Sequence, residues 1–319
     1  HFEKGIYLST FKNKNLTFLK KKFTPKDIAA ATQKRLEVII LDFIKDNIPN
    51  GSKIALAGGV FANVKINQKI SELKNISEIY VFPNMGDGGL SVGCAALSYF
   101  RHSKKFPKKI KDVYLGPSFK DRDIIIDLKK SKLNFKKIKN SEKFLAKKLN
   151  EGFVVGNFQG RMEFGPRALG NRSILVKATD KKVNDWLNKR LKRTEFMPFA
   201  PITLQKYAKK MYENLDSKKL AIKFMTTTVK CTSKAIKISP AAVHVDKTAR
   251  PQIVSKETNK KLYKIINEYL KLSKIPNLIN TSFNVHEEPI VCKPSDAFRA
   301  FKSSNLDYLY IGSYIVYKK

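Results

Sequence analysis

Helical and strand patterns alternate along the first hundred residues, and this alternation constrains the fold of the chain more than any other feature. Thr24 and Pro25 mark a helix start, since threonine accepts hydrogen bonds from the first free amides and proline fits the first helical turn. That helix is expected to end near residue 49. The elements expected beyond it are a buried strand, a helix, a strand and a helix, at 54–57, 63–73, 79–82 and 90–100. Such alternation predicts an α/β fold.

A basic segment that contains one proline, 101–111, separates this pattern from a more mixed one and is typical of a linker. We therefore predict two domains, 1–105 and 112–319, joined by residues 106–111. The elements expected in the second domain are helices at 121–130, 141–149 and 256–272 and strands at 152–158, 277–279 and 308–317.

The composition is that of a folded protein, since 42% of the residues are hydrophobic and 11% are aromatic. No apolar stretch is long enough to cross a bilayer, and the first residues, HFEKGIYLST, lack both Met and a signal-peptide pattern. Cys94, Cys231 and Cys292 are too far apart for a zinc motif or a disulfide framework. We expect a soluble, cytoplasmic protein that is cut from a longer chain and has no membrane partner.

The formal net charge of +36 raises the question of a polyanionic partner such as nucleic acid. Lysine is, however, spread along the whole chain in surface-type runs such as Lys20 to Lys22 and Lys136 to Lys139, without interleaved aromatic residues. This distribution favours a solvated lysine-rich surface over a functional electrostatic footprint. Nucleic acid is therefore not the expected partner.

A strand, a glycine pair and a helix follow one another in the segment LAGGVFANVKIN, residues 56–67. Gly58 and Gly59 allow backbone amides to approach a phosphate, and the helix behind them adds partial positive charge. Together with Asn63 they are candidates for nucleotide binding. A tight strand-to-helix turn without a ligand explains the glycine pair equally well.

A single carboxylate, Asp87, lies among glycines in the segment PNMGDGGLSVGCA, residues 83–95. At the end of a strand it is a candidate ligand for a cation. It is also a candidate N-cap for the following helix. One carboxylate does not make a metal site, and no histidine lies close to it in the sequence.

The segment richest in candidate functional residues is GNFQGRMEFGPRALGNRSILV, residues 156–176. It contains Arg161, Arg167 and Arg172, separated by glycines. Guanidinium groups match the geometry of phosphate and carboxylate, and three together repel one another unless an anion lies between them. Glu163 is a candidate ion-pair partner for one arginine, and purely structural salt bridges are the alternative.

Three further loops carry polar clusters, and such loops often line binding sites. Their residues are Lys192, Arg193 and Glu195; His244, Asp246, Arg250 and Gln252; and Asn280, Thr281, Ser282 and Asn284. The last set is able to hold an amide or carbamoyl group by hydrogen bonds, although a simple turn accounts for the same composition. His244 also fits an ordinary histidine on a strand.

In this order, the motifs closely resemble those of the O-carbamoyltransferase family of nodulation and antibiotic-tailoring enzymes, over nearly the whole chain. The resemblance rests on GGVFAN, GDGG, GRMEFGPRALGNRS, RTEFMPFAP, HVDKTARPQ, and NTSFN followed by EPIV. It implies that 1–105 is the C-terminal part of an actin-like ATPase-fold domain, related to the tRNA threonylcarbamoyl transferase. It also implies that 112–319 is a YrdC-like domain with a mixed sheet.

The resemblance further implies a reaction. The YrdC-like domain forms carbamoyl-adenylate from carbamoyl phosphate and ATP, with Mg²⁺, and the carbamoyl group passes to a hydroxyl of a small molecule or sugar. By motif position, the implied catalytic residues are Arg161, Arg193, Arg250 and Asn280. The further candidates for binding carbamoyl phosphate or ATP are Arg167, Arg172, Lys192, His244, Ser282 and Asn284.

In members of this family the transfer step uses an iron ion held by two histidines and one aspartate. Asp87 matches the aspartate, whereas the histidines belong to an upstream motif that this sequence lacks, and His1 and His102 do not replace them. The chain is therefore expected to form the adenylate but not to complete the transfer. The sequence leaves open which acceptor is used and whether the protein is a homo-oligomer.

Two other functions compete with this one. A threonylcarbamoyl-adenylate synthase that modifies tRNA shares the YrdC-like fold and suits a basic surface, but the actin-like part and the motifs RTEFMPFAP and NTSFN argue against it. A non-enzymatic polyanion-binding protein is suggested by the charge alone, and it would bind tRNA in a salt-sensitive way without turning over ATP.

Overall fold

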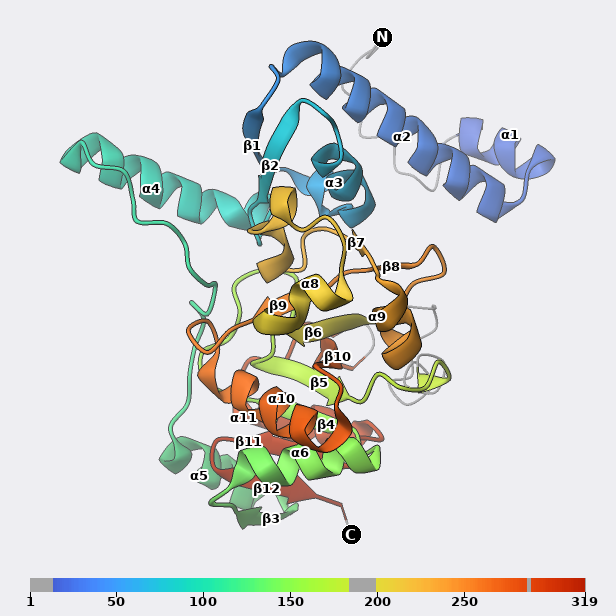
Figure 1. Cartoon of the computed structure of the whole chain (residues 1–319). Helices are drawn as coiled ribbons and strands as arrows, with labels where there is room; N and C mark the ends of the chain where they lie inside the picture. The colour runs from blue at the N-terminus through green and yellow to red at the C-terminus, as the bar shows by residue number, and fades with distance from the viewer. Residues whose placement is uncertain (1–13, 184–198, 286–287, 319) are drawn as a thin grey trace.

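The computed structural model describes residues 14–183, 199–285 and 288–318, which form a smaller first part and a larger second part (Figure 1). The elements of the first part are α1 (Lys14–Lys22), α2 (Pro25–Asn47), β1 (Ser52–Leu56), α3 (Val64–Ser71), β2 (Ile76–Val81) and α4 (Leu90–Ser103). The helices and strands predicted for this region are thus confirmed. Thr24 caps α2, because its Oγ1 accepts a hydrogen bond from the amide of Asp27. Asn63 caps α3 in the same way, through the amide of Ile66.

The strands β1 and β2 pair in parallel, and α2 and α3 pack against them around Ile44, Ile66 and Ile70. The prediction of a buried strand at 54–57 is wrong, because only one side of β1 faces this core and its other residues, Lys53 and Ala55, are exposed. The helix α4 buries none of its residues and extends away from the two strands (Figure 1).

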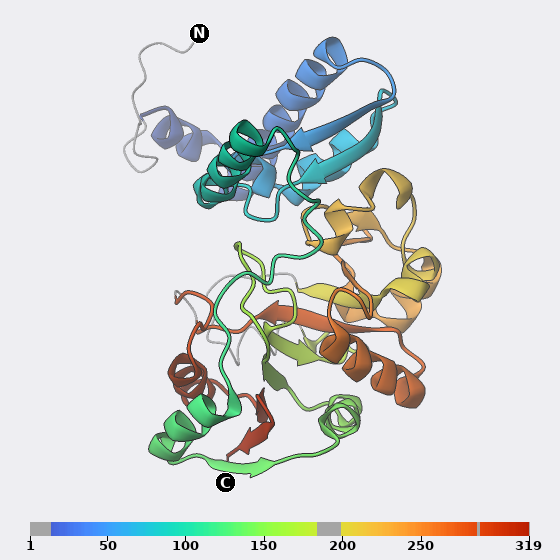
Figure 2. The same ribbon diagram turned by 90° about the vertical axis from the view of Figure 1, so that its left-hand side faces the viewer.

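The second part is built on one eight-stranded sheet (Figure 2). The strand order is β3 (Asn134–Lys137), β12 (Tyr314–Tyr317), β11 (Tyr308–Ile311), β4 (Val155–Phe158), β5 (Arg172–Val176), β10 (Asn277–Ser282), β6 (Ala200–Leu204) and β9 (Gln252–Val254). The pairs β4–β11 and β6–β9 are parallel and the other five are antiparallel, so the sheet is mixed. A separate antiparallel pair is formed by β7 (Val229–Lys230) and β8 (Thr248–Ala249). The predicted α/β class is confirmed.

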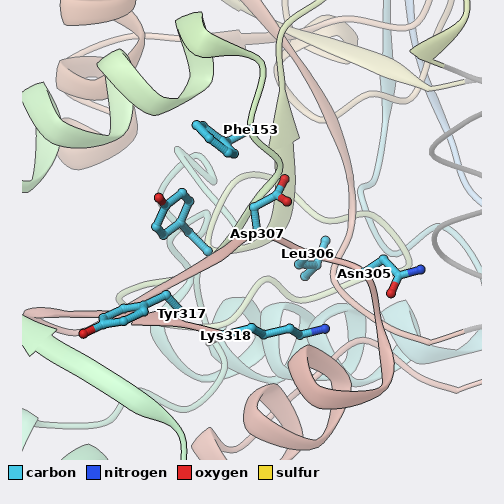
Figure 3. Close-up of a pocket in the computed structure, with 7 residues that line it drawn as sticks. Phe153, Asn305, Leu306, Asp307, Tyr317 and Lys318 are labelled. Atoms are coloured by element: carbon cyan, nitrogen blue, oxygen red, sulfur yellow. The ribbon is translucent and has the colours of Figure 1, made fainter.

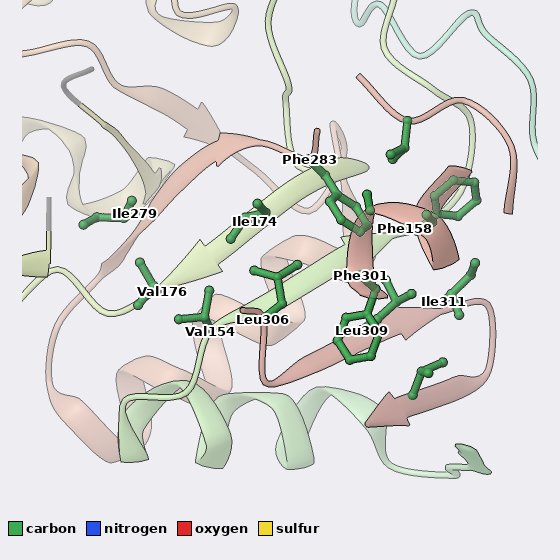
Figure 4. Packing of buried hydrophobic residues seen from close by; sticks show 14 of the residues in the cluster. Val154, Phe158, Ile174, Val176, Ile279, Phe283, Phe301, Leu306, Leu309 and Ile311 are labelled. Atoms are coloured by element: carbon green, nitrogen blue, oxygen red, sulfur yellow. The ribbon is translucent and has the colours of Figure 1, made fainter. Parts of the chain in front are cut away.

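Helices cover both faces of this sheet. They are α5 (Asp121–Ser131), α6 (Ser141–Glu151), α10 (Lys260–Ser273) and α11 (Pro294–Ser303), with the shorter α8 (Ala208–Met211) and α9 (Ser233–Ile238) packed together in a cluster of their own. On one face α6 and α10 lie side by side over Leu175. On the other face α5 and α11 cover Phe158 and Ile174, against which Phe301 packs (Figure 4). Among the described residues, no helix combines the length and the apolar character that crossing a membrane requires.

Several predicted elements have different bounds in the structure, and for two of them the cause is clear. Residues 308–317 form two antiparallel strands instead of one, because the chain reverses at Gly312, whose φ of +57° favours glycine. A side chain at this position would also approach Asp121 Oδ1 to 2.5 Å. The helix expected from residue 256 begins at Lys260, because the side chain of Asn259 accepts a hydrogen bond from the amide of Leu262.

The two parts touch through residues 216–228 of the second part, which lie against α3 and β2. Ala221 belongs to the hydrophobic core of the first part. The side chain of Asn67 donates a hydrogen bond of 2.7 Å to the carbonyl oxygen of Thr226. Thr228 Oγ1 donates one of 2.7 Å to Gln68 Oε1. Close contacts therefore join the two predicted domains. The domain boundary at 106–111 stays a prediction.

A buried carboxylate shapes the loop between β4 and β5. Oε1 of Glu163 accepts hydrogen bonds from the amides of Leu169 (2.7 Å), Asn171 (2.7 Å) and Arg172 (3.2 Å). Burial raises the pKa of the Glu163 carboxyl, and the hydrogen bonds from these amides offset part of that rise. Successive backbone amides form a concave site that commonly holds an anion, and here a side-chain carboxyl group of the same loop occupies it. Glu163 therefore fixes the position of Arg167, which lies between it and the three amides in the sequence.

Replacing Glu163 should destabilise the protein, because three amides lose their common acceptor inside the structure. Each buried donor left without a partner costs about 1–3 kcal/mol, so Glu163→Ala should lower the free energy of unfolding by at least about 3 kcal/mol. Glu163→Gln keeps one acceptor oxygen and should cost about 1 kcal/mol. Chemical denaturation measures both effects, and the exposed Glu257→Ala, which should change nothing, is the control.

The change in the free energy of unfolding caused by Glu163→Gln should also depend on pH. Burial raises the pKa of the folded-state carboxyl above its unfolded value, so folding favours the protonated form. The stability of the wild type relative to the Gln variant should therefore fall as the pH rises above the unfolded pKa. The measurement is the difference in free energy of unfolding at about pH 5 and about pH 8. A difference that stays constant or grows over this interval would contradict the prediction.

Candidate anion-binding site

Two arginines from distant parts of the chain meet where the two parts join. Arg167 comes from the β4–β5 loop and Arg250 from the turn between β8 and β9. The Nε atom of each is buried and has no hydrogen-bond partner among the described residues. Burial and the charge of Arg167 together lower the pKa of Arg250 to about 9, and burial also lowers that of Arg167. Two like charges in so poorly hydrated a place favour the binding of an anion between them.

The first part contributes directly to this site. Arg167 Nη2 donates a hydrogen bond of 3.4 Å to the carbonyl oxygen of Ala62, in the GGVFAN motif. Lys65 on α3 forms an ion pair of 2.6 Å with Asp246. Although burial acts to raise it, hydrogen bonds from Lys65 and Thr248 lower the pKa of Asp246 to about 2. Asp246 is therefore ionised and paired with Lys65, and none of the ion pairs among the described residues involves Arg167 or Arg250.

His244 lies beside Arg250. Its Nδ1 is 3.2 Å from Oγ1 of Thr248, and its amide donates a hydrogen bond to the carbonyl oxygen of the same residue. Burial and the charge of Arg250 lower the pKa of His244, so its imidazole is neutral at pH 7. His244 therefore offers a hydrogen-bonding group to the site and does not add a third cation.

Asn280 on β10 borders the arginine loop. Its Nδ2 donates hydrogen bonds to the carbonyl oxygen of Ala168 (2.8 Å) and to Gln252 Oε1 (3.3 Å). Gln252 Nε2 in turn donates one of 2.7 Å to the carbonyl oxygen of Leu169. The Oδ1 of Asn280 is buried and has no donor among the described residues. The amide is thus held in one orientation, with an acceptor oxygen left over for a ligand that carries N–H groups.

The other two arginines of the loop have different surroundings. The guanidinium of Arg172 is fully buried, lies 3.6 Å from the ring centre of Phe158, and donates to the backbone carbonyls of Gln159, Gly160, Asn171 and Pro117. Its hydrogen-bonding capacity is largely used within the protein, so the structure places Arg172 as a support of the loop. Arg161 is exposed at the loop edge and donates to the carbonyls of Leu115 and Gly116.

Two further candidates of the second part, Ser282 and Asn284, form hydrogen bonds within their own turn. Lys192 and Arg193 lie outside the described residues. Ser282 Oγ donates to Asn284 Oδ1, and Asn284 Nδ2 donates to the carbonyl oxygens of Val285 and Glu288. Ser282 and Asn284 therefore stabilise the turn after β10, in line with the turn interpretation of that motif.

The candidates of the first part act mainly on local structure. Gly58 has a φ of +113° and its amide donates to the carbonyl oxygen of Met85, while Asn63 caps α3 and donates to Gln33 Oε1. Gly59 begins the short turn that leads to Asn63. The interpretation of this segment as a strand-to-helix turn is confirmed, and its role in nucleotide binding stays a prediction.

Asp87 is exposed in a turn before α4, and its side chain does not cap that helix. Over residues 14–183, 199–285 and 288–318, no group of three or more His, Cys, Asp or Glu side chains is placed to hold a metal ion. A single carboxylate does not fit an iron centre, which needs several ligands. The described residues thus supply at most one ligand of the expected iron site, and neither iron nor Mg²⁺ enters the chemistry derived below.

Sequence reasoning missed the contribution of Lys65 and of the Ala62 carbonyl. Both lie in the segment 56–67 that was singled out for phosphate binding, so the signal was present. What the sequence does not reveal is that this segment faces Arg167 and Asp246 of the second part, more than a hundred residues away in the chain.

A hollow of about 520 Å³ lies away from the arginine pair, near the C-terminal end of the described chain (Figure 3). Phe153, Asp307 and Tyr317 are among the residues that line it. The carboxylate of Asp307 accepts a hydrogen bond of 2.8 Å from the amide of Val154, so it supports the start of β4.

Comparison with known proteins places the chain in one family. A family model described as the carbamoyltransferase C-terminus matches residues 146–318, and one described as the carbamoyltransferase N-terminus matches residues 5–96. A crystal structure of full-length HypF in the phosphate- and nucleotide-bound form aligns with 56% of this chain and 26% of its own, at 21% identity and a TM-score of 0.40. That similarity is too low to support an argument about the site.

Relatives with similar sequences are longer than this chain. An uncharacterised protein of Methanocaldococcus jannaschii is 38% identical over 303 residues, which are 91% of this chain and 56% of that protein. The nodulation protein NolO of Bradyrhizobium diazoefficiens is 33% identical over 301 residues, which are 92% of this chain and 55% of that protein. The chain thus spans about half the length of these relatives. Since the C-terminal family model alone covers more than half of its residues, the chain belongs to the carbamoyltransferase family.

Proposed function

We propose that this chain is part of an O-carbamoyltransferase that makes carbamoyl-adenylate from carbamoyl phosphate and ATP and passes the carbamoyl group to a hydroxyl of a small molecule or sugar. The observation that carries the proposal is the pair Arg167 and Arg250, whose buried Nε atoms lack partners among the described residues, together with the Oδ1 of Asn280, which is unpartnered in the same way. Family membership gives the carbamoyl group, and the arginine pair gives the phosphate site.

The proposed formation of carbamoyl-adenylate has two steps. Water cleaves the bond between the carbamoyl carbon and the phosphate oxygen, which leaves carbamate and releases phosphate. A carbamate oxygen then attacks the α-phosphorus of ATP, and pyrophosphate leaves. Negative charge is concentrated on the phosphate groups in both steps, and fixed cations in a site poor in water stabilise it most effectively. Arg167 and Arg250 supply these cations.

Asn280 is suited to the other end of the substrate. The carbamoyl group carries an NH₂ donor, and the buried Oδ1 of Asn280 is an acceptor without a partner among the described residues. The hydrogen bonds of its Nδ2 to Ala168 and Gln252 keep this oxygen in place. Neutral His244 can donate or accept one more hydrogen bond near Arg250. The substrate would therefore lie with its phosphate at the arginines and its NH₂ group at Asn280.

Several parts of the proposal extend beyond the described residues. We assign the second part, which contains Arg161, Lys192 and Arg193, to a YrdC-like adenylate-forming domain. We assign the first part to an actin-like transfer domain. In the longer protein, Asp87 would be one of several ligands of an iron ion. The reaction is assigned to the cytoplasm, and the acceptor hydroxyl belongs to a small molecule and not to a nucleic acid.

The proposal predicts an exchange reaction. The purified protein should incorporate labelled pyrophosphate into ATP only when carbamoyl phosphate is present, because adenylate formation is reversible. Arg250→Ala and Arg167→Ala should each lower the exchange rate at least about a hundredfold, as expected for loss of a charge that stabilises the reacting phosphates. Arg122→Ala, at an exposed position on α5, is the control and should leave the rate unchanged.

Three outcomes decide this test. Exchange that depends on carbamoyl phosphate and is lost in the two arginine variants supports the proposal. Exchange without carbamoyl phosphate would contradict it. The absence of any exchange would also contradict it, if both this chain and the full-length protein are folded.

A nearly isosteric substitution tests the role of Asn280. Asn280→Asp removes the NH₂ donor and, when ionised, adds a negative charge beside the anion site, so the KM for carbamoyl phosphate should rise at least about tenfold. Asn284→Asp, which changes the turn after β10, should leave this KM unchanged. Thermal unfolding of both variants checks that they fold. An unchanged KM in folded Asn280→Asp would remove Asn280 from the proposed site.

A further inference from the structure

One side-chain amide, that of Asn67 on α3, joins the two parts of the chain. Its Nδ2 donates two hydrogen bonds of 2.7 Å, to the carbonyl oxygen of Phe61 in the first part and to that of Thr226 in the second. Asn67 is fully buried, and its Oδ1 has no hydrogen-bond partner among the described residues. A buried acceptor without a partner costs free energy, so stability alone does not explain an amide at this position.

The first of these hydrogen bonds stabilises the turn that meets Arg167. Phe61 belongs to the short turn Gly59–Ala62, directly before Ala62. The carbonyl oxygen of Ala62 accepts the hydrogen bond of 3.4 Å from Arg167 Nη2. Asn67 therefore holds this turn one residue before its contact with Arg167.

The second hydrogen bond lies next to an uncommon backbone conformation. Met225, directly before Thr226, is 3% exposed and has a φ of +58°. The other non-glycine residues with positive φ in the described part of the chain are all exposed. Such a conformation costs energy for a residue with a side chain, and it persists where the surrounding structure holds it.

The residues around Met225 provide that support. The amide and the hydroxyl of Thr226 both donate to the carbonyl oxygen of Ala221, at 3.2 and 3.1 Å, and Ala221 packs in the core of the first part. Asn67 holds the carbonyl oxygen of Thr226. The Sδ of Met225 accepts a weak hydrogen bond of 3.9 Å from Asn280 Nδ2. One contact of the Asn280 amide thus depends on the first part of the chain.

We propose that Asn67 is a positioning residue for the anion site, and that its two hydrogen bonds set Arg167 and Asn280 at the same time. The inference rests on the anion site of the proposed function and adds how the first part of the chain controls it. Since Asn67 is fully buried, it acts through these groups and does not touch the ligand. The site is therefore complete only when the two parts are in contact.

Substitution of Asn67 tests this role through the affinity for an anion. Asn67→Leu keeps a branched side chain and removes both hydrogen bonds, so it should weaken the binding of inorganic pyrophosphate at least about fivefold. Asn67→Asp is closer in shape and loses at least one of the two donors, so it should weaken binding by a smaller factor. Isothermal titration calorimetry of the purified protein measures both dissociation constants, and thermal unfolding checks that the variants are folded.

Thr228→Val is the matched control. The hydroxyl of Thr228 donates a hydrogen bond of 2.7 Å across the same junction, to Oε1 of Gln68, the residue next to Asn67. Valine has nearly the shape of threonine, so this variant should lower the temperature of unfolding and leave the dissociation constant of pyrophosphate as in the wild type.

A double substitution shows whether Asn67 acts through Arg167. In Arg167→Ala protein, the further change Asn67→Leu should alter the dissociation constant of pyrophosphate less than about twofold, because the effects of residues that share one network do not add. A crystal structure of Asn67→Leu should show a changed φ at Met225 and the loss of its contact with Asn280.

The outcomes separate this inference from the proposed function. An unchanged dissociation constant in the folded Asn67 variants overturns the inference and leaves the proposed function in place. An equal loss in Thr228→Val, or full additivity with Arg167→Ala, also overturns it, because Asn67 would then only stabilise the fold. Pyrophosphate binding that does not depend on Arg167 would remove the anion site, and both proposals would fall. If binding depends on Asn67 as expected but pyrophosphate exchange fails, the positioning role stands and the proposed reaction falls.

Discussion

The carboxylate of Glu163 is the group on which the arrangement of the candidate site depends. It collects the amides of Leu169, Asn171 and Arg172, which would otherwise point into the protein without an acceptor. The loop that it closes provides Arg167, and its carbonyl oxygens orient Asn280 and Gln252. A carboxyl group of the protein itself thus sets the positions of the groups that we propose bind an anion from solution. Because Glu163 is covalently part of the loop, this order does not depend on a ligand being bound.

The arginines of this region differ in function because their hydrogen bonds end in different places. Arg172 donates to four backbone carbonyls, and its plane lies on Phe158, so its charge is spread over groups of the protein. Arg167 has a single long hydrogen bond, to Ala62, and Arg250 has none among the described residues. Within this motif the structure thus places Arg172 as a support of the loop and leaves Arg167 available for the binding role proposed for it. The free hydrogen-bonding capacity of each guanidinium, more than its position in the motif, indicates which is which.

Local signals in the sequence predicted local structure well. The pair Thr24 and Pro25 gave the start of α2, and Asn63 marked the start of α3, because capping depends on residues only three positions apart. The run 308–317 was misread as one strand because its residues favour strands throughout, although Gly312 was a signal for the reversal. The exposure of β1 was not predictable in this way, since burial depends on what packs against a strand and not on the strand itself.

The candidate site was predicted in its residue types but not in its grouping. Arg250 and Asn280 were among the implied catalytic residues and Arg167 among the further candidates. In the structure Arg250 lies near Arg167, and Asn280 donates a hydrogen bond to Ala168, the residue after Arg167. The pairing of Arg167 with Arg250 and its contact with Ala62 are long-range features that no spacing in the sequence encodes. Family resemblance grouped the motifs because it carries the three-dimensional arrangement of other chains. The bare sequence predicted an anion site, and the fold was needed to show which candidate groups lie close together.

The net charge of +36 and the arginine pair act over different distances, and this separates attraction from recognition. Many lysines are exposed, where salt screens their field within about 10 Å at ordinary ionic strength. Such a field raises the encounter rate with any polyanion, ATP and nucleic acid alike, and does not select between them. Arg167 and Arg250 are partly exposed, whereas their Nε groups are buried. In the proposed site a small phosphorylated molecule reaches these groups and a nucleic acid meets the lysines at the surface, so the proposal attributes selectivity for small anions to burial and not to charge.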